Sequence, residues 1–295
     1  MDLPDLELRH LRCLIAVAEA GTITDAAIDL GLTQPAVSRA LAQLEQRIGA
    51  LLVERTTRRL ALTAAGEAFR DHAAQALTAV DDAIAAARGQ VRPLRLGYSW
   101  AAAGQYTNTL LRRWRAAFPD VDLQVRRSDD RSAGLSAGAV DLAVVRVKLD
   151  EPRLVSEPLF LEHRFLAVAD DHPLASRKRV ALADLHHETL IISSTTGSTT
   201  LDLWPDDVVP KSVIDVANID EWLTAIGSGQ GLGVTAASTT HQHPRPGITY
   251  VPLSGAPPVV TYIAHDSTRV HPRHREFVEL AREVVRSGGT SQRRL

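Results

Sequence analysis

The stretch TQPAVSRALAQLEQRIG, residues 33–49, constrains the fold more than any other part of the sequence. It predicts one uninterrupted helix with Pro35 in its first turn, where proline is tolerated because the first N–H groups of a helix have no partner within it. Small side chains surround Arg39 on the first full turn. The helix therefore begins with little bulk and a single well-placed guanidinium group.

Two shorter helices are predicted before this stretch. Apolar residues recur at helical spacing through residues 7–20, and residues 23–30 form a second, short helix. Gly31 permits a sharp turn, Ala27 is small enough for two helices to approach closely, and Val37 supplies a core contact from the third helix. This pattern predicts a helix-turn-helix.

The slim start of the third helix suits the reading of DNA. A recognition helix enters the major groove with its N-terminal residues, so hydrogen-bonding side chains there can contact base edges. Arg39 can bind a guanine edge and Gln34 an adenine edge, and each pairing contributes about 1–3 kcal/mol of discrimination. A three-helix protein-interaction domain with an ordinary capped helix is the alternative. The candidate DNA-binding residues of this helix are Thr33, Gln34, Pro35, Ala36, Ser38 and Arg39.

Residues 51–63, LLVERTTRRLALT, predict a β-hairpin wing after the helices. Its turn carries arginines that would contact phosphates and position the module without reading sequence. The net charge of the whole chain is only −2, but residues 34–63 hold five arginines against two glutamates. The candidate phosphate-contacting residues are Arg55, Thr56, Arg58 and Arg59.

A long helix is predicted over residues 64–88, which would span about 37 Å. Its apolar residues recur at alternating spacings of four and three, as in a coiled-coil seam. Because alanines in the seam let a second helix come close, we expect a homodimer or homotetramer; packing of the helix on its own domain is the alternative. The seam residues are Phe69, Ala73, Ala76, Val80, Ala83 and Ala87.

Residues 21–67, GTITDAAIDLGLTQPAVSRALAQLEQRIGALLVERTTRRLALTAAGE, closely resemble the N-terminal domain of LysR-type transcriptional regulators. The resemblance runs without a gap through the helix-turn-helix, the wing and the start of the long helix. Two positions depart from the family: Ala50 stands where proline is usual, and Val53 where phenylalanine is usual. The resemblance implies a sequence-specific regulator that binds double-stranded promoter DNA and a small-molecule effector, with no membrane partner.

Beyond Arg92 and Pro93, strand-like runs alternate with amphipathic helices, which predicts parallel strands with crossover helices. The resemblance implies two α/β lobes with a ligand cleft between them, similar to a periplasmic binding protein. The predicted architecture is therefore an α/β multidomain protein. It would comprise a winged helix-turn-helix DNA-binding domain (1–63), a linker and dimerisation helix (64–90), an effector-binding domain (91–287, with lobe 1 at about 91–163 and 266–287 and lobe 2 at about 164–265) and a disordered tail (288–295).

Hydroxyl groups after predicted strands mark the expected ligand site, because ligands collect outside the carboxyl ends of strands in such sheets. Ser99 lies there, at a helix N-terminus whose N–H groups suit a carboxylate. Arg146 could bind an acidic effector through two parallel hydrogen bonds, or equally pair with Asp129, Asp130 or another acid. Residues 192–200, ISSTTGSTT, form either a wall of the cleft or a polar loop with helix-capping residues. The candidate effector-binding residues are Ser99, Trp100, Ala101, Ser128, Arg146, Ser193, Ser194 and Thr195, and the expected effector is an organic acid or another small anion.

The segment GYSWA, residues 97–101, allows a different function. It resembles the G-x-S-x-G turn that presents the nucleophile of α/β-hydrolases, with alanine in the last position. His265, His271 and His274 are available as bases, so a serine hydrolase fused to a DNA-binding head is the alternative. Since a short motif with one substituted position is common by chance, we expect no catalytic residues and no enzyme.

The sequence also disfavours other classes of site. Cys13 is the only cysteine, which excludes an internal disulfide and a site with several thiolate metal ligands. No apolar run approaches the roughly 20 residues that span a bilayer, and the acidic start lacks a secretory signal, so we expect a cytoplasmic protein. The glycines of residues 227–233 do not have dinucleotide-binding spacing. We expect no metal and no cofactor, and interpret His186, His187, His241 and His243 as surface residues.

Overall fold

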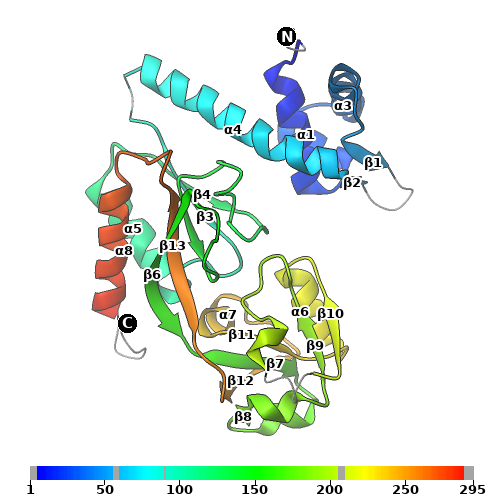
Figure 1. The fold of residues 1–295 in the computed structure, drawn as a ribbon, viewed down its shortest axis with the longest axis vertical. Coiled ribbons are helices and arrows are strands. Elements are labelled where there is room, and N and C mark those ends of the chain that lie inside the picture. Colours follow the sequence, from blue (N-terminus) through cyan, green and yellow to red (C-terminus); the bar gives the residue numbers. More distant parts are fainter. Residues whose placement is uncertain (1–4, 56–59, 90, 205–209, 289–295) are drawn as a thin grey trace. The chain divides into compact units, whose positions relative to one another are not determined.

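Residues 5–55, 60–89, 91–204 and 210–288 are described by a computed structural model (Figure 1). The chain divides into two units, one of residues 1–92 with 136–139 and the other of residues 93–135 with 140–295. The predictions made for the tail beyond residue 288 and for the wing turn, which holds Thr56, Arg58 and Arg59, lie outside the described residues.

The first unit begins with three helices whose ends follow from local sequence. Gly31 has left-handed backbone, with φ at 63°, a conformation that most side chains disfavour. The hydroxyl of Thr22 accepts a hydrogen bond from the backbone N–H of Asp25 at 3.0 Å and thereby caps the second helix. The predicted helix-turn-helix is present. Its helices are α1 (Leu8–Ala20), α2 (Ile23–Leu30) and α3 (Gln34–Ile48).

These helices share one apolar core with the start of the wing. Val37 and Leu44 of α3 are fully buried, and Ala27 of α2 is buried against the same core. Because Ala27 carries only a methyl group, α2 and α3 can pack closely, as the sequence predicts. Val53 is also buried in this core, so the smaller side chain at this position is accommodated.

The wing is a short antiparallel pair of strands, β1 (Val53–Arg55) and β2 (Leu60–Leu62). The carboxylate of Glu45, on α3, accepts hydrogen bonds from the backbone N–H groups of Leu52 and Val53 at 2.9 and 3.0 Å. These two bonds satisfy backbone donors that would otherwise lack partners, and they fix the start of the wing to the third helix.

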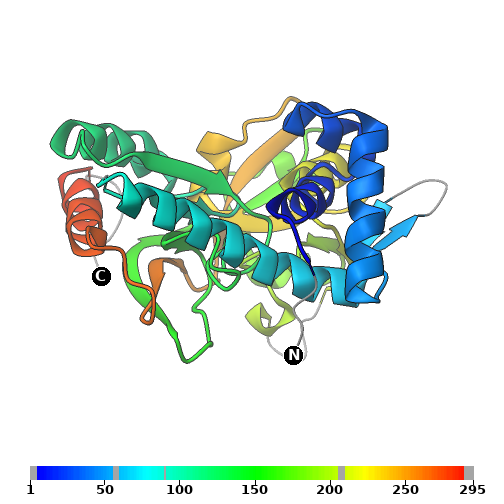
Figure 2. The ribbon, with the colours of Figure 1, turned by 90° about the horizontal axis from the view of Figure 1, so that it is seen from above.

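The long helix α4 (Ala64–Ala87) begins directly after the wing, and Figure 2 shows it as one continuous rod. Thr63 caps it by accepting a hydrogen bond from the backbone N–H of Gly66 at 2.9 Å. Of the predicted seam, Ala73 is buried and Phe69 packs partly against the core of the first unit. Ala76, Ala83 and Ala87 are exposed. The association of this seam with a second copy stays a prediction.

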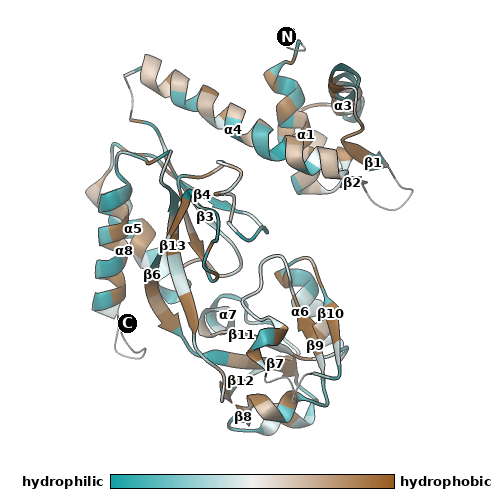
Figure 3. Cartoon of the chain, viewed as in Figure 1, coloured by the Kyte–Doolittle hydropathy of each residue, from teal (hydrophilic) through white to brown (hydrophobic). Residues whose placement is uncertain are grey.

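The second unit contains a five-stranded mixed sheet in the order β4-β3-β5-β13-β6. β3 runs parallel to β4 and β5, whereas β13 runs antiparallel to β5 and β6. Helices α5 and α8 pack side by side over the same apolar core. Figure 3 shows both hydrophobic and hydrophilic residues along α8. The elements are β3 (Leu94–Tyr98), α5 (Thr107–Ala117), β4 (Leu123–Arg127), β5 (Leu142–Val145), β6 (Leu154–Glu162), β13 (Val259–Asp266) and α8 (His274–Gly288).

A second sheet in the same unit has the order β11-β7-β12-β8, with β9 and β10 forming a separate parallel pair. The sequence predicts parallel strands here, and this is wrong for β7, which pairs antiparallel with both β11 and β12. The elements are β7 (Arg164–Ala169), β8 (Val180–Ala181), β9 (Thr189–Ile192), β10 (Ser212–Asp215), α6 (Ile219–Gly227), β11 (Gly233–Ala236), α7 (Ala237–Gln242) and β12 (Ile248–Ser254).

The chain passes between the two sheets twice. Only His163 separates β6 from β7, and residues 255–258 connect β12 to β13. Val259 pairs with Glu162 across the strands at these crossings. Because β13 is bonded to β5 and β6, the chain returns to the first sheet by residue 259, earlier than the boundary at 266 that the sequence suggests.

Candidate functional site

The predicted DNA-binding residues of the first unit gather on the first turns of α3. Thr33, Gln34, Pro35 and Arg39 are exposed, and Ala36 and Ser38 are half-buried. The guanidinium Nε of Arg39 donates to the backbone oxygen of Pro35 at 3.3 Å, one turn earlier in the same helix. The start of the helix thus presents hydrogen-bonding side chains with little bulk around them, which is the geometry a major-groove contact requires.

The phosphate-contacting candidates are placed only in part. Arg55 ends β1, and its backbone pairs with Leu60 of β2. Its side chain, like Thr56, Arg58 and Arg59 of the wing turn, lies outside the described structure. Contacts between these residues and phosphates stay a prediction.

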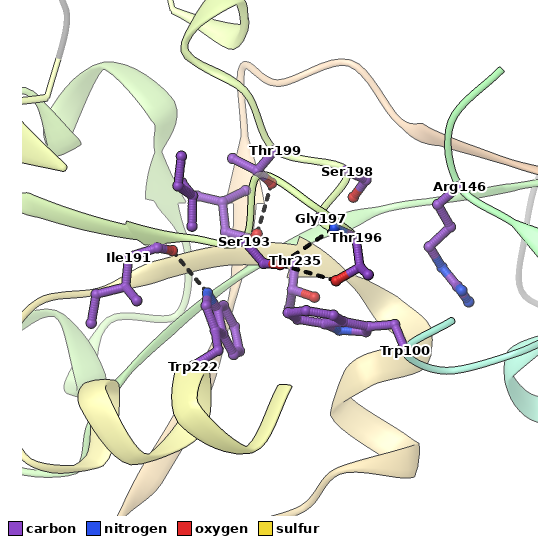
Figure 4. Close-up of a pocket in the computed structure, with 12 residues that line it drawn as sticks. Trp100, Arg146, Ile191, Ser193, Thr196, Gly197, Ser198, Thr199, Trp222 and Thr235 are labelled. Atoms are coloured by element: carbon purple, nitrogen blue, oxygen red, sulfur yellow. Dashed lines mark hydrogen bonds between the residues drawn. The ribbon is translucent and has the colours of Figure 1, made fainter. Parts of the chain in front are cut away.

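A pocket lies between the two sheets of the second unit (Figure 4). Three of the predicted effector-binding residues line it: Trp100, Arg146 and Ser193. Trp100 follows β3 and Arg146 follows β5, so both come from the first sheet. The remaining wall comes from the second half of the unit: Ile191, Ile192, Thr196, Gly197, Ser198, Thr199, Trp222, Val234 and Thr235.

Trp100 joins the two halves of this unit. Its indole N–H donates to the hydroxyl of Thr239 at 3.1 Å, and its ring meets that of Trp222 edge to face with 5.6 Å between centroids. Its backbone has φ of 61°, which is unfavourable for a bulky residue and persists only where surrounding contacts hold it. Ser99 and Ala101, on either side of Trp100, are buried and do not line the pocket.

Arg146 is held by a carboxylate that the sequence did not single out. Its Nε lies 3.0 Å from a carboxylate oxygen of Glu162, and the two side chains are only 6% and 1% exposed. The second nitrogen, Nη2, donates to the backbone oxygen of Ala102 and the hydroxyl of Ser238 at 2.9 and 2.7 Å. Nη1 is buried and has no hydrogen-bond partner in the described part of the chain. Arg146 therefore pairs with Glu162, rather than with Asp129 or Asp130, and keeps one donor unused.

Glu162 is correspondingly stabilised as a carboxylate. Burial by itself would raise its pKa. The charge of Arg146 and hydrogen bonds from Ser238 and Thr261 more than offset this, so the pKa of Glu162 lies below its usual value. Glu162 is therefore ionised at neutral pH, and its charge offsets that of Arg146.

A cluster of hydroxyl groups forms the opposite wall. Ser193 and Thr196 are hydrogen-bonded through their hydroxyls at 3.0 Å, and Thr199 donates to the backbone oxygen of Val234 at 2.8 Å. A Cβ at Gly197 would lie 2.4 Å from the backbone oxygen of Ser193, so only glycine fits this turn. Figure 4 shows Arg146 and this hydroxyl cluster on different sides of the pocket.

Besides Ser99 and Ala101, three further candidate residues lie outside the pocket. Ser194 is exposed and bonds through its backbone N–H and hydroxyl to the carboxylate of Asp215, while Thr195 is exposed. Ser128 donates to Asp130 at 2.6 Å. For both Ser194 and Ser128, a carboxylate outside the pocket accepts the hydrogen bond that the hydroxyl donates.

The hydrolase alternative finds no assembled site in the described residues. Gly97 is needed for packing, because a Cβ there would lie 2.1 Å from the backbone oxygen of Ala133. The rings of His265 and His274 contact each other, with 4.8 Å between their centroids. His271 accepts a hydrogen bond from the backbone N–H of Arg273. Among the hydrogen bonds of the described residues, none joins His265 or His274 to Ser99.

Sequence reasoning missed several residues around this pocket. Thr196, Ser198 and Thr199 belong to the hydroxyl-rich residues 192–200, but they were not among the candidates from that stretch. Trp222 and Thr235 come from α6 and β11, and no local pattern places them beside Trp100. Arg164 was also missed. It begins β7 and donates to the backbone oxygen of Ser198 and the hydroxyl of Thr199, both at 3.1 Å.

Other classes of site receive no support from the described structure. No group of three or more histidine, cysteine, aspartate or glutamate residues there could hold a metal ion. Among the described helices, none is both long and apolar enough to cross a membrane. The glycine-rich stretch from Gly227 to Gly233 ends α6 and leads into β11, as its sequence order indicates.

Comparisons with protein families match both units. Residues 8–67 match the model described as bacterial regulatory helix-turn-helix protein, lysR family, and residues 87–286 match the LysR substrate binding domain. The uncharacterised HTH-type transcriptional regulator YnfL of Escherichia coli is 37% identical over 63% of this chain and 65% of its own length. The chain thus spans slightly less than two thirds of that relative.

Two further comparisons cover most of the chain. The HTH-type transcriptional regulator TfdS of Cupriavidus pinatubonensis is 32% identical over 85% of this chain and 84% of its own length. The crystal structure of CbnR, a LysR family transcriptional regulator, has a TM-score of 0.63 at 26% identity and covers 95% of this chain and 99% of its own. Full-length CbnR in complex with its target DNA gives a TM-score of 0.60 at the same identity and covers 95% of this chain and 100% of its own.

Proposed function

We propose, from the premise that this chain belongs to the LysR family of transcriptional regulators, that it binds promoter DNA sequence-specifically under the control of a small molecule. The observation that carries the DNA-binding part is the start of α3, where Gln34 and Arg39 are exposed on a slim first turn. The similar protein CbnR has been solved with its target DNA, which supports the same use of this unit.

The effector is proposed to bind in the pocket between the two sheets of the second unit. The observation that supports this is the buried Nη1 of Arg146, which lines the pocket and has no partner among the described residues. A buried donor without a partner loses free energy that a bound acceptor restores. We therefore propose a small organic acid or another small anion, and no other cofactor.

Control by the effector is proposed to work through a shift between two conformations. A molecule that contacts both Arg146 and the hydroxyls of Ser193 and Thr196 favours the arrangement of the sheets in which both walls reach it. Through homodimers or homotetramers joined along α4, that shift would change the spacing of the DNA-binding units.

The protein is proposed to act in the cytoplasm and to catalyse no reaction. Both proposals follow from family membership. The relatives described above are transcriptional regulators, whose DNA lies in that compartment. Labelling of Ser99 by a fluorophosphonate probe would contradict the second proposal and revive the hydrolase alternative.

Affinity selection of sheared genomic DNA by the full-length protein, followed by sequencing, tests the proposed function. We expect enriched fragments that share an interrupted palindrome near a promoter, because two half-sites are read by two copies. Arg39→Ala should lose this enrichment, whereas Arg113→Ala, which removes an exposed arginine of the second unit, should keep it. Enrichment no greater than with beads alone would overturn the DNA-binding proposal.

A further inference from the structure

Arg164 is a buried guanidinium beside the pocket, and within the described residues all its partners are neutral. It is 8% exposed and begins β7. Nε donates to the backbone oxygen of Pro257 at 2.9 Å, Nη1 to the hydroxyl of Thr199 and Nη2 to the backbone oxygen of Ser198, both at 3.1 Å. No carboxylate of the described chain forms an ion pair with it.

Burial lowers the pKa of Arg164 to about 10. The guanidinium nonetheless stays protonated at neutral pH, because that value remains well above 7. A buried cation whose partners are all neutral is uncommon, since desolvation of a charge is costly unless an opposite charge lies nearby. The side chain therefore leaves positive charge uncompensated next to the pocket.

Asp215, which bonds Ser194 beside the pocket, is exposed to solvent, so the desolvated charges at the pocket are Arg146, Glu162 and Arg164, which sum to one positive charge. Arg146 and Glu162 lie 3.0 Å apart and offset each other. Arg164 is the remaining cation, and it contacts two pocket residues, Ser198 and Thr199. Arg146, the residue with a free donor, is thus not the source of the net charge.

We propose that Arg164 is the positioning residue that makes the pocket select a monoanion. It supplies the positive potential and fixes the turn at Ser198 and Thr199, while Nη1 of Arg146 is the donor that touches the anion. This inference rests on the proposed function and adds the charge class of the effector and the origin of its recognition.

Thr199 shows why Arg164 acts without touching the ligand. Its hydroxyl accepts from Arg164 and donates to the backbone oxygen of Val234 at 2.8 Å, and Arg164 itself does not line the pocket, since each of its three guanidinium nitrogens bonds to Pro257, Ser198 or Thr199. The third bond of Arg164, to Pro257, ties the same guanidinium to the segment between β12 and β13. A purely structural role would need these donors but not the charge.

Quenching of tryptophan fluorescence separates charge from structure, because Trp100 and Trp222 line the pocket. The full-length chain and the variants Arg164→Gln, Arg164→Lys and Arg113→Gln are titrated with iodide at constant ionic strength and separately with neutral acrylamide. Arg113→Gln is the matched control, since it removes one exposed arginine far less desolvated than Arg164.

We expect the iodide quenching constant of Arg164→Gln to fall at least about twofold, which corresponds to roughly 0.4 kcal/mol. The Lys variant and the Arg113 control should keep the original constant, and acrylamide should quench all four proteins equally. An unchanged iodide constant in Arg164→Gln, with unchanged acrylamide quenching, would overturn the proposal.

A second measurement uses the unaltered protein and so does not depend on how the Gln variant folds. Thermal stability is measured with small monocarboxylates, from acetate to benzoate, and with the primary amide of each. We expect at least one carboxylate to raise the melting temperature while its amide, at the same concentration, does not. Amides as effective as their acids would overturn the charge inference and leave the effector proposal standing.

The two proposals therefore fail in different ways. If neither acids nor amides bind, but iodide discriminates as expected, the effector proposal fails while the charge of the pocket stands. If acids bind and Arg164→Gln retains the same preference for acids over amides, Arg164 does not set the selectivity and this inference is overturned.

Discussion

Arg39 and Arg146 are the same residue type in two regions built in different ways. Arg39 is exposed, and its side chain makes one hydrogen bond within the described chain, to Pro35 of its own helix. Arg146 is 6% exposed and is held by Glu162, Ala102 and Ser238, the last of these 92 residues away in the chain. Removal of the first should change only what the surface binds, whereas disturbance of the second should change the stability of the fold.

The largest effect is expected from Glu162→Gln. This substitution keeps the shape of the side chain but leaves Arg146 as a buried charge without a counter-ion, which typically costs about 3–5 kcal/mol. Chemical denaturation of the full-length chain measures it. The control Glu283→Gln breaks the exposed pair with Arg113 and should cost no more than about 1 kcal/mol. Equal losses of unfolding free energy in the two variants would show that the buried pair stabilises the fold no more than the exposed pair does.

The same variant should alter the pH dependence of stability. Because the pKa of folded Glu162 is lowered, its contribution is fully present above the usual carboxyl pKa of about 4.5 and is lost as the pH falls through the lower, folded value. The difference in unfolding free energy between the original protein and Glu162→Gln should therefore shrink on acidification below that range. A difference that stays constant down to strongly acidic pH would contradict the lowered pKa.

Arg39→Ala should have an intermediate effect, and on binding alone. Affinity for the selected DNA site should fall by about 1–3 kcal/mol, with relaxed preference at one base pair. The unfolding free energy should change by no more than about 0.5 kcal/mol, since the side chain is exposed. Titration of labelled DNA and denaturation of the same preparation measure both. Unchanged affinity and base preference would remove Arg39 from the readout.

The smallest effect is expected from Arg58→Ala in the wing turn. A phosphate contact carries no sequence information, so binding should weaken evenly across DNA sequences and the slope of log affinity against log salt should flatten by about one. Titrations at several salt concentrations with specific and unrelated DNA measure this. A loss confined to one sequence would indicate that Arg58 contacts a base.

The same contrast explains how far the sequence alone could be interpreted. The helix-turn-helix depends on local signals: Gly31 takes the left-handed turn, and Ala27 and Val37 lie at fixed offsets from it. The pocket depends on which strands become neighbours. Trp222 and Trp100 lie 122 positions apart in numbering and meet only because α6 packs beside the loop after β3.

Hydroxyl-bearing residues were the least predictable part of the site. Residues 192–200 are polar and follow the end of β9, as the sequence predicts, but their composition does not tell which hydroxyls face inward. Ser194 bonds to Asp215, on the neighbouring strand β10, and Ser193 faces the pocket. The sequence around Arg164 carried no signal, because only the fold shows that this residue has no carboxylate partner among the described residues.

The two crossings between the sheets of the second unit also have a mechanical meaning. The passages at His163 and at residues 255–258 lie beside each other, with Val259 paired to Glu162 and Arg164 bonded to Pro257. Two adjacent covalent links resist sliding and twisting of one half against the other, and leave rotation about the line through them as the easiest motion. If an effector binds in the pocket as proposed, it would therefore act by changing one angle between the two halves of this unit.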